Sequence, residues 1–117
     1  VPVSQLPGLI QATSRDVKEN NVVGPCFGHA GYGNFHCILV YDDDDDEDDL
    51  ERLKQVNANL IERTLAAGGT CTGEHGVGSG KKAYLLREKG AAAVGAMRAI
   101  KAALDPRGVM NPGKVFD

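Results

Sequence analysis

Residues 28–37 read GHAGYGNFHC, and this stretch holds two of the three histidines of the chain. Residues 31–34 have the composition of a turn, and largely apolar runs flank them at 22–29 and 35–41. The pattern predicts a β-hairpin whose strands are joined across this turn. Gly24-Pro25 predicts a bulge or an edge position in the first strand. The second strand is apolar on both faces, so it is predicted to be buried.

Helical spacing of apolar residues recurs on both sides of the hairpin. Helices are predicted from Ser4 to about Asn20, from the end of an acidic block to Leu65, at Lys81–Lys89 and at Ala91–Leu104. Short strands are predicted at Val1–Val3 and Thr70–Thr72. This order predicts an α+β fold: a ferredoxin-like half of an antiparallel sheet with helices on one face, followed by C-terminal helices.

Length and composition limit the classes of function. The 117 residues predict one compact domain, and the formal net charge is −3. Most of the acid lies in the block YDDDDDEDDLE at 41–51, where Asp48 or Asp49 is expected to cap the following helix. The remainder is mildly basic, without a basic stripe interleaved with aromatics, so no nucleic-acid partner is expected. No apolar run approaches about twenty residues and no signal peptide is recognisable, which predicts a soluble domain.

Two further features concern context. The chain begins VPVSQLP, without methionine and already apolar, which is typical of a domain cut from a longer protein. Its cysteines, at 26, 37 and 71, are odd in number and lack CxxC spacing. We therefore expect reduced, buried thiols in a cytoplasm-like compartment rather than disulfides or nucleophiles.

The histidines suggest a metal site. Across a hairpin turn, His29 and His36 can come side by side, and the neighbouring glycines leave room for that approach. Glu74, in the glycine-rich run TCTGEHGVGSG, is the natural third donor. Two histidines and a carboxylate leave coordination positions open, as a catalytic metal requires. The alternative is that each histidine only forms hydrogen bonds within its loop.

His75 directly follows Glu74, so the two side chains diverge unless the loop is tightly bent. It is then better suited to accept a proton than to bind the metal, since its ordinary pKa lies near neutrality. A surface or supporting role for His75 is the alternative. The run GVGSGKK fails as a phosphate loop, because His75 stands where a glycine is needed and Lys82 where Ser or Thr is needed.

Three long motifs, GHAGYGNFHCILV, GGTCTGEHGVGSGKKAYL and ALDPRGVMNPGKVF, resemble the C-terminal domain of FAD-linked oxidases. The similarity is to the group that includes D-lactate dehydrogenase (cytochrome), the glycolate oxidase FAD subunit and D-2-hydroxyglutarate dehydrogenase. It extends over nearly the whole chain. It implies that residues 1–117 are the C-terminal part of a substrate or cap domain, with a separate FAD-binding domain elsewhere in the same protein.

The resemblance also implies roles for individual residues. The residues matching His29, His36 and Glu74 hold a divalent ion (zinc, manganese or iron), and His75 is the base. Asn34 matches a polar residue at the substrate site, and Asn111 is the expected flavin contact. One departure is that Tyr32 stands where the family usually has an aspartate, which predicts weaker metal binding if that aspartate supports a histidine.

The leading hypothesis is therefore part of an FAD-dependent enzyme that oxidises a small D-2-hydroxy acid to the 2-oxo acid and is inactive as a fragment. The competing class is a non-enzymatic, ferredoxin-like module that binds metal or small acids. The electron acceptor is not specified by the residues, and a homodimer is left open. The resemblance implies a cytoplasmic protein in bacteria or a mitochondrial one in eukaryotes, with peripheral membrane association through the acceptor as a further option.

Overall fold

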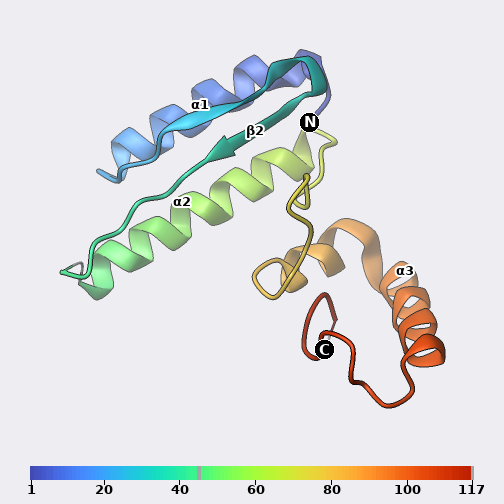
Figure 1. Ribbon diagram of the computed structural model, residues 1–117. Helices are drawn as coiled ribbons and strands as arrows, with labels where there is room; N and C mark the ends of the chain where they lie inside the picture. The colour runs from blue at the N-terminus through green and yellow to red at the C-terminus, as the bar shows by residue number, and fades with distance from the viewer. Residues whose placement is uncertain (45, 117) are drawn as a thin grey trace. The chain divides into compact units, whose positions relative to one another are not determined.

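The computed structural model describes residues 1–44 and 46–116. Its described elements are three α-helices, short 3₁₀ turns and a two-stranded antiparallel sheet, so the α+β prediction is confirmed (Figure 1). The chain divides into two compact units, Val1–Gly69 and a second one that begins at Thr70, rather than the single one expected from its length.

The predicted hairpin is confirmed, although its strands are shorter than expected. Strand β1 (Cys26–His29) pairs antiparallel with β2 (Asn34–Cys37), and an isolated bridge between Val23 and Val40 continues the pairing. Gly24-Pro25 separates this bridge from β1, because proline has no N–H to donate to the sheet. The prediction of a buried second strand was wrong: β2 is half-buried and Val40 beyond it is 48% exposed, because no third described strand pairs with it.

Helix α1 (Leu6–Glu19) begins after a 3₁₀ turn, η1 (Val3–Gln5). The turn replaces the strand predicted at the start of the chain, and Gln5 rather than Ser4 precedes the helix. The buried face of α1 carries Leu6, Leu9, Thr13 and Asp16. The Thr13 hydroxyl donates to the Leu9 carbonyl (2.8 Å), which allows this polar side chain to be fully buried.

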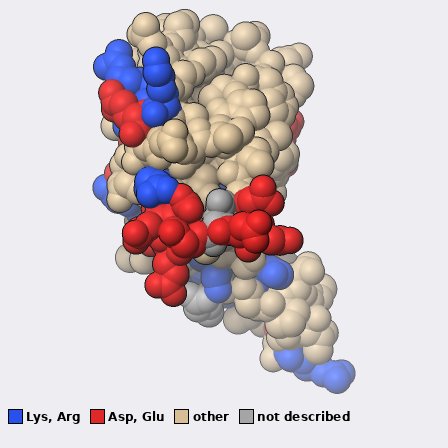
Figure 2. Space-filling view, turned by 90° about the vertical axis from the view of Figure 1, so that its left-hand side faces the viewer, with Lys and Arg blue, Asp and Glu red and all other residues tan. Residues whose placement is uncertain are grey.

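Helix α2 (Glu47–Ala66) buries Leu53, Val56 and Ile61. The capping prediction was wrong in its residue: Asp46 is the cap, and its side chain accepts from the Asp49 amide (2.9 Å). Asp49 in turn accepts from the Asp46 amide (3.3 Å), so the two form a reciprocal capping box. Figure 2 shows a dense group of acidic side chains on the face where Figure 1 places the start of α2.

A buried carboxylate joins α1 to α2. Asp16 accepts hydrogen bonds from Arg63 (2.7 Å) and Asn59 (3.1 Å) of α2, and also from Asn20 (3.0 Å) at the end of α1. The Asp16 side chain is only 9% exposed. Such a charge is stable away from water only because donors surround it, so this cluster fixes the contact between the helices. Figure 1 shows both helices running alongside the hairpin.

The second unit is built on α3 (Lys82–Leu104), which bends at Gly90 (φ 77°, ψ 163°). The bend divides it into two helical segments at the place predicted, and Leu85 and Val94 are buried on either side of it. The strand predicted at Thr70–Thr72 is not formed, and the hydroxyls of Thr70 and Thr72 instead approach each other at 2.8 Å. In the described part of the chain, no helix is both long enough and apolar enough to span a bilayer.

Candidate metal centre and substrate-facing residues

The two hairpin histidines lie on one face of the sheet. The register pairs His29 with Asn34 and Phe27 with His36, and strand alternation directs both histidines to the same side. Their ring centroids are 6.0 Å apart in an edge-to-face arrangement, and one ring nitrogen of each lies within 4.8 Å of the other's. His36 also stacks on Phe27 at 5.1 Å. The predicted proximity of the pair is thus confirmed within the first unit.

Two glycines make this geometry possible. Gly33 closes the turn in the left-handed region (φ 70°), where a side chain is disfavoured, and a Cβ there would overlap the carbonyl oxygen of Val1. The backbone nitrogen of Val1 donates to the Gly33 carbonyl (2.8 Å), which fixes the turn. A Cβ on Gly28 would overlap the backbone of Phe35 on the opposite strand. The glycines therefore permit the tight turn and the close pairing that bring the histidines together.

Asn34 and Tyr32 occupy different environments in this turn. Asn34, the first residue of β2, is half-buried and lies directly opposite His29. Tyr32 belongs to the 3₁₀ turn η2 (Ala30–Tyr32) and is 87% exposed. A side chain so open to water contributes little packing here. The structure thus places the polar residue predicted for the substrate directly opposite a histidine.

Glu74 and His75 lie in the second unit, in a loop of left-handed glycines. The Glu74 carboxylate oxygen and the His75 Nε2 atom are 3.9 Å apart, so this loop is bent tightly enough to bring the two adjacent side chains together. His75 is 74% exposed and Glu74 48% exposed, which leaves both accessible to a small molecule. The meeting of Glu74 with the histidine pair of the first unit stays a prediction.

A carboxylate that the sequence did not single out anchors the residues before this loop. Glu88 on α3, only 8% exposed, accepts from the backbone N–H (3.1 Å) and the thiol (3.3 Å) of Cys71 and pairs with Lys89 (2.7 Å). Burial would raise the pKa of Glu88, but the hydrogen bonds from Lys89, Thr70 and Cys71 outweigh burial and lower this pKa to about 2. The charged carboxylate therefore holds the chain three residues before Glu74.

A second carboxylate fixes the C-terminal tail in the same way. Asp105, at the end of α3, accepts from the backbone N–H groups of Val109 and Met110 (both 2.9 Å) and from Lys101. The hydrogen bond from Lys101, followed by that from Met110, lowers the pKa of Asp105 to about 2. Asn111 follows in the left-handed region (φ 47°) and lines a cavity of about 410 Å³.

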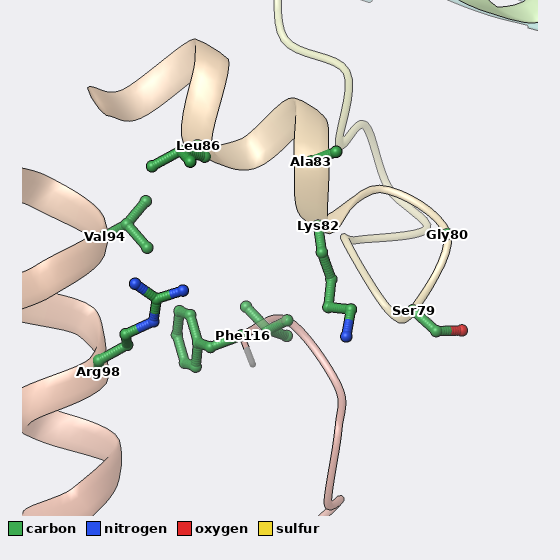
Figure 3. Close-up of a pocket in the computed structure, with 9 residues that line it drawn as sticks. Ser79, Gly80, Lys82, Ala83, Leu86, Val94, Arg98 and Phe116 are labelled. Carbon is green, nitrogen blue, oxygen red and sulfur yellow. The ribbon is translucent and has the colours of Figure 1, made fainter. Parts of the chain in front are cut away.

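A second cavity of the same unit, of about 320 Å³, opens beside the bend of α3 (Figure 3). Its lining combines the cationic side chains of Lys82 and Arg98 with apolar Leu86, Val94 and Phe116. Figure 3 shows Val94, Arg98 and Phe116 near one another, with the Lys82 side chain extending separately from the start of α3. A lining of this kind suits a small anion with an apolar body, but none of the residues predicted for chemistry belongs to it.

Two of the three cysteines have environments that disfavour a nucleophilic thiolate. Burial, and then the hydrogen bond and charge of Cys26, raise the pKa of the Cys37 thiol to about 12. Burial, and then the neighbouring Glu88, also raise the pKa of Cys71. A thiolate at Cys37 or Cys71 is disfavoured near neutral pH. The predicted burial is confirmed for Cys71, whereas Cys26 and Cys37 are only half-buried.

These features define a class of protein. Residues 1–115 match the family described as FAD linked oxidases, C-terminal domain, and the chain belongs to this family. The resemblance drawn from the three motifs is thereby confirmed.

Individual relatives narrow the comparison. The chain is 50% identical over 117 residues to probable D-lactate dehydrogenase, mitochondrial, of Danio rerio, covering 100% of this chain and 23% of that protein. It is 47% identical over 116 residues to D-lactate dehydrogenase (cytochrome) 1, mitochondrial, of Saccharomyces cerevisiae, covering 99% and 19%. It is 41% identical over 117 residues to glycolate oxidase subunit GlcD of Bacillus subtilis, covering 99% and 24%. The chain thus spans about a fifth to a quarter of the length of these curated relatives.

Proposed function

We propose that this chain is the metal- and substrate-facing part of an FAD-dependent enzyme that oxidises a D-2-hydroxy acid to the 2-oxo acid. Membership of the FAD-linked oxidase family supports the cofactor, and relatives named as D-lactate dehydrogenases and a glycolate oxidase subunit support a substrate of that size. The observation that carries the proposal is the pair His29 and His36 on one face of a glycine-shaped hairpin.

The histidine pair fits a divalent cation. Zinc binds histidine nitrogen at roughly 2.0–2.1 Å, so two such ligands are separated by at most about 4 Å. The observed separation of ring nitrogens, within 4.8 Å, needs only a small side-chain rotation to reach that value. His29 is exposed and His36 half-buried, so the pair is anchored on one side and open on the other. An open side is what a catalytic ion needs to meet a substrate.

We assign Glu74 as the third ligand. Two imidazoles and one carboxylate suit zinc, manganese and iron alike, so the donor set does not select among them. When bound, such an ion supplies a Lewis acid that lowers the pKa of the substrate's 2-hydroxyl group. FAD, when bound, supplies the hydride acceptor.

His75 is the proposed base. Its imidazole accepts the proton of the 2-hydroxyl group as the substrate is oxidised, and its exposure leaves room for that approach. Asn34, opposite His29, is placed to hydrogen-bond the substrate. Asn111, held in the tail by the Asp105 turn, is the proposed flavin contact.

The remaining structure belongs to a larger protein in this proposal. Residues 1–117 are the C-terminal part of the substrate or cap domain, and an FAD-binding domain of the same protein is the principal partner. The hairpin is half of a ferredoxin-like sheet with helices on one face; the partial exposure of β2 and of Val40 supports its continuation by further strands. An electron acceptor, which the residues do not specify, completes the assembly, and a homodimer is left open. We place it in the bacterial cytoplasm or, since two relatives are named mitochondrial, in mitochondria, with membrane association only through the acceptor.

The test uses the intact protein, its bound flavin and its metal content. D-lactate and glycolate should reduce an artificial dye, and a chelator should abolish this activity until a divalent ion is restored. If the purified protein binds metal but contains no flavin and reduces no dye, the non-enzymatic module is the correct reading. Activity that survives complete metal removal removes the ion from the proposal.

Two substitutions separate the base from the ligands. His36→Ala should lose both metal and turnover. His75→Ala should lose turnover while its metal content stays near wild type. Loss of metal from His75→Ala would show that the base and a ligand have been exchanged.

A further inference from the structure

Cys26 and Cys37 face each other across the hairpin, at the start of β1 and the end of β2. The Ile38 N–H donates to the Pro25 carbonyl (3.1 Å), so the adjacent pair Pro25 and Ile38 occupies a hydrogen-bonded position of the ladder. Hydrogen-bonded and non-hydrogen-bonded pairs alternate along antiparallel strands. The two cysteines therefore occupy a non-hydrogen-bonded position, where opposing side chains approach most closely.

The two thiols converge on one acceptor. Both donate to the Gly24 carbonyl oxygen, at 3.6 Å for Cys26 and 3.7 Å for Cys37. Non-hydrogen-bonded pairs have Cα atoms about 4.5 Å apart, and disulfides accept Cα separations of roughly 4.4–6.8 Å. A bond between these sulfurs is therefore compatible with the backbone as it stands. Both residues are half-buried, so a small oxidant can reach them.

We propose that Cys26 and Cys37 form a reversible cross-strand disulfide, making this hairpin a site of oxidative modification. Strand alternation places the cysteines on the face opposite His29 and His36, so the bond forms without occupying the histidine face. The inference does not depend on the proposed catalytic activity. Its consequence is that oxidation fixes the register of the same two strands that carry the histidines.

The reaction requires a two-electron oxidant, for which a peroxide serves. The Cys26 sulfur attacks one peroxide oxygen and the O–O bond breaks. This step releases one water and converts Cys26 to a sulfenic acid. The Cys37 sulfur then attacks the Cys26 sulfur and displaces the second water. In total two thiols and one hydrogen peroxide give one disulfide and two waters. Reduction by a dithiol returns both thiols.

Cys71 provides the internal contrast. It is buried and its thiol donates to Glu88, and it has no cysteine opposite it in a strand. A general susceptibility of the chain to oxidation would affect Cys71 as well. A response restricted to the other two cysteines is what the hairpin geometry predicts.

The experiment oxidises the intact, reduced protein with hydrogen peroxide and maps its peptides by mass spectrometry. The expected product is a peptide pair linked through Cys26 and Cys37, lighter by two hydrogens and restored by dithiothreitol. Cys71→Ala should give the same product, and Cys26→Ser should lose it. Oxidation in concentrated denaturant should lower the yield of this pair relative to other cysteine products, because the pairing depends on the fold.

Two results would overturn the inference, and both can be read from the wild-type protein alone. The first is that Cys26 and Cys37 are recovered as free thiols under conditions that oxidise a model thiol. Their conversion to separate sulfinic acids without the linked peptide is the other.

Discussion

The anchoring role of Glu88 can be tested by Glu88→Gln, which keeps the shape of the side chain and removes its charge. The carboxylate is 8% exposed, accepts two hydrogen bonds from Cys71 and pairs with Lys89. The amide oxygen of glutamine can still accept from the Cys71 N–H. The charge-assisted contribution is lost, and with it the second carboxylate oxygen that faces Lys89.

The size of the effect follows from the contacts. A pKa lowered from 4.5 to about 2 sets an upper limit of about 3.5 kcal/mol, since one pKa unit corresponds to about 1.4 kcal/mol. Lys89 is 44% exposed, so solvent screening reduces that contribution. We expect the variant to lower the free energy of opening around Cys71 by about 1.5–2 kcal/mol, within the range of a lost charged hydrogen bond. That change raises the open population roughly 10- to 30-fold.

The assay follows the reaction of Cys71 with dithiodipyridine, a thiol reagent that also works in acid, with peptide mapping to isolate this cysteine. The Cys71 rate in Glu88→Gln should rise roughly 10- to 30-fold over wild type. Glu51→Gln is the matched control, because Glu51 forms only an exposed contact with Lys54 (3.4 Å) and should leave the rate unchanged. An equal Cys71 rate in wild type and Glu88→Gln would refute the anchoring role.

The same assay has a pH signature. The folded pKa of Glu88 lies below its ordinary value of 4.5, so its stabilisation is complete above that value and is lost as the pH falls from 4.5 toward 2. Wild-type Cys71 should therefore become more reactive between about pH 5 and pH 3, after correction with a free thiol. Glu88→Gln should lack this component, and a pH dependence equal to wild type would contradict the assignment.

Three further substitutions test the rest of the framework. Gly33→Ala should lower the free energy of unfolding, measured by urea titration, by about 2 kcal/mol or more, because the left-handed backbone and the Val1 carbonyl leave no room for Cβ. Its control is Gly31→Ala, which has open space around it and should change this free energy by no more than about 0.5 kcal/mol. Asp16→Ala should cost about 2–3 kcal/mol in the same titration, since it strips the α2 donors of their acceptor. Asp105→Ala should accelerate hydrogen exchange of the Val109 and Met110 amides, which donate to Asp105 in the wild type. Unchanged exchange would show that other contacts hold the tail.

The hairpin and the helices could be predicted from the sequence because their signals are local. Turn residues between apolar runs define the hairpin, and glycines mark where α2 ends and where α3 bends. The proximity of His29 and His36 followed from the same local pattern, since strand pairing converts sequence spacing into spatial contact. The capping residue of α2 was missed because any of several consecutive aspartates satisfies the sequence rule.

The carboxylates at Asp16 and Glu88 could not be predicted, because their partners are remote in sequence or are backbone groups. Asp16 meets Arg63 across 47 positions, and Glu88 meets Cys71 across 17. Neither residue type nor helical spacing distinguishes them from solvated charges elsewhere on the same helices. The partial exposure of β2 also could not be predicted. An apolar strand is predicted to be buried whether or not the described chain supplies the strands that would cover it.

Glu88 and Asp105 solve the same physical problem in the second unit. The backbone N–H groups of a loop lie outside any helix or sheet. They need other hydrogen-bond acceptors if the loop is to keep one conformation. Glu88 supplies the acceptor three residues before Glu74, and Asp105 supplies it directly before Asn111. Both have pKa values lowered to about 2, so both remain charged wherever a histidine base can work. Mild acidification should therefore leave both carboxylates charged and both segments held in place.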